Sequence, residues 1–390
     1  MGDKKKLIVL AAGGTAGHIN AAIALEKKFL DNNFEVLFFS GKRPLDYKLF
    51  AGKKIIYLDG RPIKYKNPIK IVWSLYKNIL AFIKVLTTIY KLKPTLAIGA
   101  GGYICGPVLM AHYLLRIPFF IIEQNAVLGV TNKILLLFAD KIFIHLKHTI
   151  GISKFFDKKI IVSGNPIRSE FLTTDFFKKD AKRKNDNNNE FAVIVFGGSL
   201  GAKSINDLIE DFISSLLKNY DLNFKLKIKH QTGKKVQEKR AAQTLIPSTI
   251  NNENFTYEQT EYLDNICEEY CNHDFIICRA GASTISELRF VRKPVMLFPY
   301  PHHKDRHQFM NAESLKTESL FAVYILDEND KENDLSINNF SALKEIFKIQ
   351  FNIKFNIQSE KLPKQQVAKN LSLNMKDATE IIYSSLINYL

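Results

Sequence analysis

The sequence LIVLAAGGTAGHINAAIALEKKF (residues 7–29) is the most informative part of this 390-residue chain. It begins with a continuous apolar run, passes through Gly13-Gly14-Thr15-Ala16-Gly17, and continues with apolar side chains at helical spacing. An apolar run bounded by glycine is typical of a strand that is buried on both faces. A second apolar run follows at residues 35–39, so the pattern predicts a β-α-β unit within a parallel sheet.

The same strand–glycine–helix pattern occurs three more times, in TLAIGAGGY (95–103), FAVIVFGGSLGA (191–202) and DFIICRAGASTISE (274–287). Gly197 follows Gly13 at nearly the same separation as Gly281 follows Gly102. This repetition predicts two doubly wound α/β domains in tandem, with their join near residues 163–166. We interpret the polar tract 178–190 as an insertion. Ligands of such sheets bind beyond the carboxyl ends of the strands, so we expect a cleft between the domains.

The composition excludes several classes of protein. With 46% hydrophobic residues and only four cysteines, the chain is neither disordered nor a disulfide scaffold, and we expect reduced thiols in a cytoplasmic protein. The whole formal net charge of +16 lies in residues 1–165, which contain 25 basic and 9 acidic residues. Such an asymmetry indicates a nucleic acid, an anionic membrane surface or a polyanionic substrate as partner.

Four glycine turns that each precede a helix favour a phosphate-bearing ligand, because a helix N-terminus presents backbone N–H groups and a positive dipole. A nicotinamide dinucleotide does not fit, since no G-x-G-x-x-G follows the first strand and Ser40-Gly41 stands where an acidic ribose ligand is expected. The chain also lacks the G-x-x-x-x-G-K-[ST] pattern of P-loop proteins. A nucleotide sugar agrees best with these features.

Several polar residues lie at the predicted carboxyl edges. His18 follows the first glycine turn and is either a general base or a phosphate-contacting or capping residue. Glu287 either binds a ribose or is a helix-N-terminal acid favoured by the dipole. The polar cluster 302–308 predicts a site, with a metal as an alternative because of its three histidines. Cys267, Cys271, His273 and Cys278 match no common zinc module.

The segment PIKIVWSLYKNILAFIKVLTTIYKLKP (68–94) has an apolar arc wider than a core-facing helix needs. Its lysines recur every seven residues and form one narrow stripe, at Lys70, Lys77, Lys84 and Lys91. Two of these lysines fall inside the length of a membrane span, which disfavours a transmembrane helix. We expect helices that contact an anionic membrane surface through Trp73, Ile79, Phe82 and Ile83, with a helix buried between other elements as the alternative.

Taken together, seven motifs resemble the MurG family of N-acetylglucosaminyltransferases. They are GGTAGH (13–18), GAGGYICGP (99–107), EQNAVLGVTNK (123–133), SGNPIR (163–168), FGGSLGAKSIN (196–206), CRAGASTISE (278–287) and PYPHHKDRHQFMNA (299–312). They stand in the family's order and cover the chain from residue 7 to about residue 325.

The resemblance implies a GT-B fold of two Rossmann-like domains, at residues 1–165 and 166–369, with a C-terminal helix at about 370–390 that packs back on the first domain. It implies an inverting transfer of GlcNAc from UDP-GlcNAc to the muramoyl 4-hydroxyl of undecaprenyl-linked lipid I, which gives lipid II. No metal, cofactor or nucleic acid is implied. The family works at the cytoplasmic face of the cell membrane, which agrees with the basic, apolar segment 68–94.

The resemblance also implies roles for residues at matching positions. His18 is the candidate base or an acceptor contact, Glu287 would bind the ribose and Gln308 the GlcNAc hydroxyls. The backbone of Leu263 would contact uracil, and Ser199 and Arg168 would bind the diphosphate. The remaining donor-binding positions are Thr15, Ala16, Gly17, Asn125, Ala282, Ser283, Thr284, Ile285 and Ser286.

This chain departs from the family after His18, where Ile19-Asn20-Ala21-Ala22 replaces a segment that usually contains proline. Two alternatives stay open at this point. One is another GT-B glycosyltransferase with a different lipid acceptor, and the other is a basic scaffold without enzymatic activity.

Overall fold

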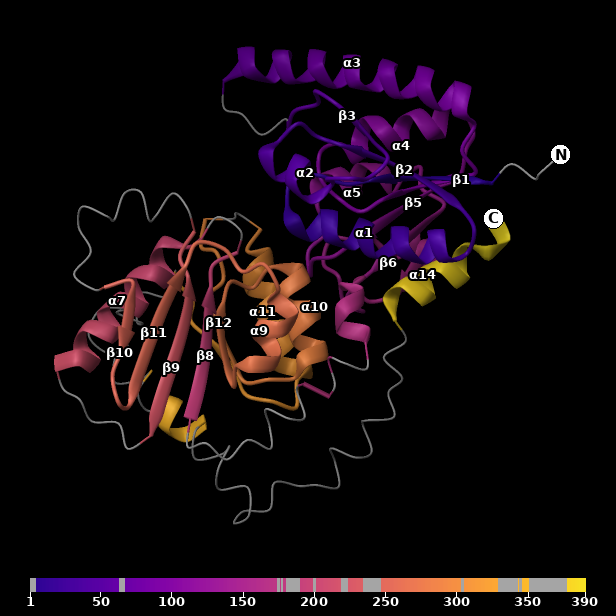
Figure 1. The fold of residues 1–390 in the computed structure, drawn as a ribbon. Coiled ribbons are helices and arrows are strands. Elements are labelled where there is room, and N and C mark those ends of the chain that lie inside the picture. Colours follow the sequence, from indigo (N-terminus) through magenta and orange to yellow (C-terminus); the bar gives the residue numbers. More distant parts are fainter. Residues whose placement is uncertain are drawn as a thin grey trace. The chain divides into compact units, whose positions relative to one another are not determined.

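The structure is a computed structural model that describes residues 5–62, 67–173, 176, 178–179, 190–198, 201–218, 224–233, 247–302, 305–328, 343, 346–350 and 377–390. Most of the predicted insertion at 178–190 therefore lies outside the described residues. The chain divides into two compact units (Figure 1). Unit 1 comprises residues 1–168 and 375–390, and unit 2 comprises residues 169–374.

Unit 1 is built on a parallel sheet of seven strands in the order β3-β2-β1-β4-β5-β6-β7. Successive residues of β1 enter opposite cores: Val9 and Ala11 pack on one face of the sheet, and Ile8 and Leu10 pack on the other. This explains why the strand sequence is continuously apolar. The strands are β1 (Leu7–Ala11), β2 (Glu35–Ser40), β3 (Ile55–Tyr57), β4 (Leu96–Gly99), β5 (Phe119–Glu123), β6 (Lys141–Ile144) and β7 (Ile160–Val162).

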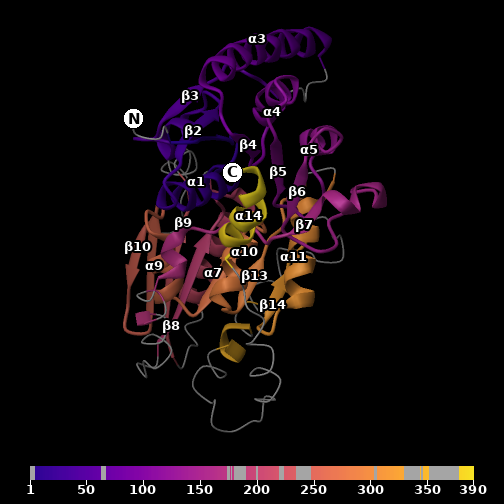
Figure 2. The same ribbon diagram turned by 90° about the vertical axis from the view of Figure 1, so that its right-hand side faces the viewer.

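Helices cover both faces of this sheet, as Figures 1 and 2 show. One face packs against α3 (Pro68–Leu92), α4 (Cys105–Leu114) and α5 (Val130–Leu135). The other face packs against α1 (Ala16–Asp31) and α14 (Ala378–Leu386), so the C-terminal helix lies against unit 1. The shorter elements of unit 1 are α2 (Pro44–Leu49), η1 (Lys154–Lys159) and η3 (Ile387–Tyr389).

Unit 2 repeats this architecture with the strand order β10-β11-β9-β8-β12-β13-β14, in which only the β10–β11 pair is antiparallel. Its strands are β8 (Glu190–Phe196), β9 (Lys225–Gln231), β10 (Thr249–Asn251), β11 (Phe255–Thr260), β12 (Phe275–Cys278), β13 (Val295–Leu297) and β14 (Val323–Ile325). Its helices include η2 (Ser169–Leu172), α7 (Lys203–Lys218), α9 (Ile266–Asn272), α10 (Ala282–Val291) and α11 (His307–Glu318). The predicted fold of two Rossmann-like sheets is confirmed.

Helix α3 has an unusual distribution of burial. Only Ser74, Ala81, Val85 and Ile89 are buried along its 25 residues. Its exposed apolar side chains include Ile69, Val72, Trp73, Tyr76, Ile79, Leu80, Ile83 and Tyr90. Phe82, which we expected to contact the membrane, is half-buried and packs partly against the core. Within the described part of the chain, no helix is long and apolar enough to cross a membrane.

Polar contacts attach this helix to the loop after β3. The amide of Asn78 pairs with the backbone of Arg61 through two hydrogen bonds of 2.9 Å. Lys77 forms an ion pair of 2.6 Å with Asp59, and Lys84 donates to the carbonyl of Tyr57 at 3.3 Å. Two lysines of the predicted stripe therefore bind the protein itself.

All four cysteines are buried, and none of them forms a disulfide bond. Burial raises the pKa of the Cys105 thiol to about 12 and also raises that of Cys278. Among the residues that the structure describes, no group of three or more His, Cys, Asp or Glu side chains could hold a metal ion. These residues include Cys267, Cys271, His273 and Cys278.

Two buried histidines make stability depend on pH. Burial lowers the pKa of His112 in α4 and of His273 in unit 2 to about 4. An unfolded chain binds a proton at each of these residues below pH 6.5, whereas the folded protein does not until the pH approaches 4. The stability they contribute is therefore present above pH 6.5 and is lost as the pH falls from 6.5 to 4.

We expect the free energy of unfolding to fall by roughly 3 kcal/mol per histidine across this interval. Urea unfolding at a series of pH values measures the decrease. In His112→Gln, the decrease for unit 1 should become much smaller, whereas His148→Gln, which changes an exposed histidine, should behave as wild type. An equally steep decrease in His112→Gln would contradict the assignment.

Candidate active site

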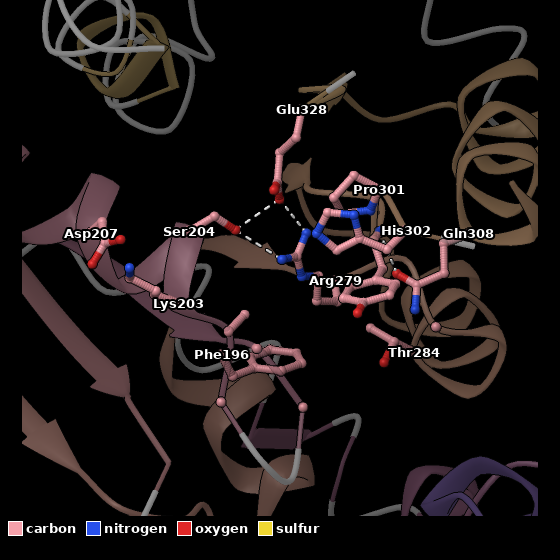
Figure 3. Close-up of a pocket in the computed structure, with 16 residues that line it drawn as sticks. Phe196, Lys203, Ser204, Asp207, Arg279, Thr284, Pro301, His302, Gln308 and Glu328 are labelled. Atoms are coloured by element: carbon pink, nitrogen blue, oxygen red, sulfur yellow. Dashed lines mark hydrogen bonds and ion pairs between the residues drawn. The ribbon is translucent and has the colours of Figure 1, made fainter. Parts of the chain in front are cut away.

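Unit 2 contains a pocket at the carboxyl ends of β8 and β12, where the strand order of the sheet reverses. This is the position at which doubly wound sheets bind ligands. The pocket has a volume of about 610 Å³ and is drawn in Figure 3. Its lining residues are Phe196, Gly197, Gly198, Gly201, Ala202, Lys203, Ser204, Asp207, Arg279, Gly281, Thr284, Tyr300, Pro301, His302, Gln308 and Glu328.

The glycine turn after β8 forms one wall of this pocket and leads into α7. A β-carbon on Gly197 would lie 2.3 Å from the backbone nitrogen of Ala202, and one on Gly201 would lie 2.0 Å from the carbonyl oxygen of Thr232. Gly201 also has a φ of +75°. Glycine is therefore required here, and the turn directs the N-terminus of α7 at the pocket, an arrangement that suits an anion.

Arg279 lies at the centre of the pocket wall and joins four segments of unit 2 (Figure 3). Its guanidinium donates to the carbonyls of Phe298 at 3.1 Å and Pro299 at 3.2 Å, and to the hydroxyl of Ser204 at 2.8 Å. It also forms an ion pair with Glu328, which accepts a hydrogen bond from Ser204 at 2.8 Å. With its donors directed at protein oxygens, Arg279 shapes the pocket, and exposed Lys203 is another cation in its lining.

Among the described residues, Gln308 and Thr284 are the predicted donor-binding residues that line the pocket. The backbone N–H of Tyr300 donates to the Gln308 side-chain oxygen at 2.9 Å. That contact uses one lone pair of the amide oxygen, and the NH₂ group of the same side chain is a donor that suits a ligand oxygen. A sugar hydroxyl is a suitable acceptor.

The other predicted residues of α10 have different surroundings. Ile285 is part of the apolar interior, and buried Ser286 donates its hydroxyl to the carbonyl of Ala282 at 2.9 Å. Glu287 is 5% exposed and accepts a hydrogen bond from the Tyr270 hydroxyl at 3.2 Å. It does not line the pocket itself, but it shares a helix face with Thr284, one turn earlier. Ala282 and Ser283 are half-buried in the first turn of α10.

Unit 1 has a related arrangement at the carboxyl ends of β1 and β4. Thr15 caps α1, and its side chain accepts a hydrogen bond from the His18 backbone at 3.4 Å. Nδ1 of the His18 ring lies 3.1 Å from the carbonyl of Gly13. A carbonyl only accepts, so Nδ1 carries the proton and Nε2 of the neutral ring is the basic nitrogen. Helix α1 forms without the proline that the family has after this histidine.

The remaining predicted residues are spread over both units. Asn125, in unit 1, donates its side-chain and backbone N–H groups to buried Glu123 at 3.1 and 3.0 Å. Arg168 is the last residue of the main segment of unit 1, and half-buried Leu263 lies between β11 and α9 in unit 2. Ala16 and Gly17 form the first turn of α1, and Ser199 lies outside the described residues.

Arg279, Ser204 and Glu328 are pocket residues that sequence reasoning did not select. Arg279 could have been identified from its position directly after a buried strand and before a glycine turn. Glu328 had no comparable signal, because it is distant in sequence from both of its partners.

Comparison with solved structures places the fold in a known group. The structure of Acinetobacter baumannii MurG matches with a TM-score of 0.65 at 23% identity, over 94% of this chain and 99% of that one. A UDP-N-acetylglucosamine 2-epimerase matches with a TM-score of 0.57 at 10% identity, over 99% and 97% of the two chains. At these identities the likeness shows the fold alone, which different activities share.

Sequence comparison is more specific. The family 28 glycosyltransferase N-terminal domain matches residues 8–144, and the C-terminal domain of the same family matches residues 192–371. Together with two Rossmann-like sheets and the pocket at the carboxyl ends of β8 and β12, these matches define a GT-B glycosyltransferase.

Two curated relatives carry the name UDP-N-acetylglucosamine–N-acetylmuramyl-(pentapeptide) pyrophosphoryl-undecaprenol N-acetylglucosamine transferase. That of Rickettsia bellii is 35% identical over 313 residues, which are 80% of this chain and 84% of the relative. That of Rickettsia typhi is 32% identical over 98% of both chains. This chain belongs to the MurG family of glycosyltransferases.

Proposed function

We propose that this protein transfers GlcNAc from UDP-GlcNAc to the muramoyl 4-hydroxyl of undecaprenyl-linked lipid I, which gives lipid II for peptidoglycan synthesis. The observation that carries the proposal is the 35% identity over 80% of the chain to a transferase named for this donor and this acceptor. The pocket of unit 2 supports it independently, because a glycine turn, a helix N-terminus and an amide donor suit a nucleotide sugar.

We assign the parts of the donor to the residues that match the family's donor-binding positions. Glu287 binds the ribose hydroxyls, Gln308 binds hydroxyls of the sugar, and the backbone of Leu263 contacts uracil. Ser199 and Arg168 bind the diphosphate, and the N-terminus of α7 stabilises the charge that develops on the departing UDP. Thr15, Ala16, Gly17, Asn125 and the first turns of α10 complete the donor site.

His18 acts as the general base of the transfer. Its Nε2 accepts the proton of the acceptor hydroxyl while the hydroxyl oxygen forms a bond to the anomeric carbon of GlcNAc. The bond from that carbon to the diphosphate oxygen breaks in the same step, and its electron pair leaves with UDP. A single displacement of this kind inverts the anomeric configuration.

The exposed apolar face of α3 contacts the cytoplasmic face of the cell membrane and keeps the protein peripheral. The observation that supports this is a run of exposed side chains, from Ile69 at 77% to Ile83 at 49%, on a helix that also carries exposed Lys70 and Lys91. The rings of Tyr113 and Phe138, 4.9 Å apart, add exposed aromatic surface on the same layer of helices. Apolar side chains bordered by lysines suit an anionic lipid surface.

The function is tested by transfer of labelled GlcNAc from UDP-GlcNAc to a lipid I analogue with a shortened, water-soluble prenyl chain, with EDTA present. We expect a labelled disaccharide product. If UDP raises the melting temperature of the protein but no product forms, the acceptor is a different lipid. If UDP causes no stabilisation either, the chain is not a UDP-sugar transferase.

His18→Ala should lower kcat in this assay by about 10²–10⁴-fold, because the displacement then lacks its general base. The KM for UDP-GlcNAc should change little. His148→Ala removes an exposed histidine of the same unit and serves as the control. A small loss confined to the KM of the acceptor would instead indicate that His18 only contacts the acceptor.

Replacing Trp73, Ile79 and Ile83 together by Ser should release the protein from phosphatidylglycerol-containing vesicles in a sedimentation assay, with an unchanged melting temperature. The matched control replaces Leu172 and Leu320, which are exposed in unit 2, and should leave binding intact. Undiminished binding of the α3 variant would contradict the proposed membrane face.

A further inference from the structure

Tyr270 is a fully buried residue of α9 that connects the donor pocket to Glu287. Its ring packs against Phe196, with centroids 6.1 Å apart, and against Phe171 at 5.8 Å. Phe196 is the last residue of β8 and lines the pocket. The Tyr270 hydroxyl donates to Oε2 of Glu287 at 3.2 Å.

Tyr270 is also held through its backbone. The ammonium group of Lys293, which is 4% exposed, donates to the carbonyls of Tyr270, Cys271 and His273 at the C-terminal end of α9. Lys293 follows α10, and Glu287 lies within α10. The two residues therefore hold Tyr270 of α9 at its backbone carbonyl and at its side-chain hydroxyl. The helix dipole favours a positive charge at the C-terminal end of α9, and this stabilises the contact with Lys293.

The position of Glu287 gives the hydroxyl a specific task. The carboxylate is almost completely buried, and the Tyr270 hydroxyl reaches one of its two oxygens. A buried polar group needs hydrogen-bond partners to compensate its lost hydration, and the Tyr270 hydroxyl is such a partner. It binds one carboxylate oxygen and thereby limits rotation of the group.

We propose that Tyr270 is a positioning residue for ribose recognition, whose hydroxyl orients the Glu287 carboxylate to accept hydrogen bonds from both ribose hydroxyls of the donor. This inference rests on the proposed role of Glu287. It predicts that removing one oxygen atom from Tyr270, which does not line the pocket, weakens the recognition of two hydroxyl groups and nothing else on the ligand.

The test compares the binding of UDP and of 2′,3′-dideoxy-UDP by isothermal titration calorimetry. In Tyr270→Phe, the Kd of UDP should rise about fivefold to tenfold, because the Glu287 carboxylate loses the hydrogen bond that orients it toward the ribose, whereas the Kd of dideoxy-UDP should not change. Glu287→Ala should raise the Kd of UDP to that of dideoxy-UDP. The double variant should then bind UDP no more weakly than Glu287→Ala alone.

Tyr257→Phe provides a matched control, because Tyr257 is an equally buried tyrosine of unit 2 whose hydroxyl binds His230 and Gln259. In this variant, the ratio of the Kd of dideoxy-UDP to the Kd of UDP should equal that of wild type. The positioning role is overturned if Glu287→Ala makes the two Kd values equal while Tyr270→Phe leaves their ratio unchanged. It is also overturned if Tyr270→Phe raises the Kd values of both ligands by the same factor. If wild type does not distinguish the two ligands, the ribose role of Glu287 fails and the inference fails with it.

Discussion

Both units depend on backbone segments that approach each other too closely for any side chain. A β-carbon on Gly102 would lie 2.2 Å from the carbonyl oxygen of Gly13, and one on Gly201 would lie 2.0 Å from that of Thr232. Backbone atoms cannot move aside as a flexible side chain can, so these positions require glycine. The same contact in unit 1 places the His18 ring against Gly101, where a β-carbon would lie only 2.6 Å from it. The turns thereby set the position of the candidate base as well as the shape of the pocket.

An arginine and a tyrosine support the glycine turn region in each unit. In unit 1, Arg43 donates to the carbonyl of Gly14 at 3.1 Å and lies over the ring of Tyr103 at 5.1 Å. In unit 2, Arg279 donates to the carbonyls that follow β13 and lies over the ring of Tyr300 at 5.6 Å. Both guanidinium groups donate to backbone carbonyls that lie beyond the carboxyl ends of strands. Both arginines therefore stabilise the backbone around the site through these hydrogen bonds.

This division of tasks explains which features could be predicted from the sequence. The strands and glycine turns follow from local patterns, since burial on both faces and positive φ values leave a signature within ten residues or so. The partners of Arg279 do not, because Glu328 and Ser204 reach it only through the fold of unit 2. The pattern predicts Glu287 one turn into a helix, and it lies in α10, but its burial and its contact with Tyr270 depend on how α9 packs, which periodicity does not contain.

Helix α3 illustrates the same limit and its functional consequence. Its amphipathic pattern predicted an apolar face and a lysine stripe, but a pattern cannot say which face meets the protein. The structure attaches the helix through Lys77, Asn78 and Lys84 to the loop after β3, and through a narrow row of buried residues that ends at Ile89. Because these contacts hold the helix in place, its wide apolar face is not needed for folding. Exposed apolar surface of this extent is disfavoured in water, and the lipid-facing role that we propose for α3 would cover it.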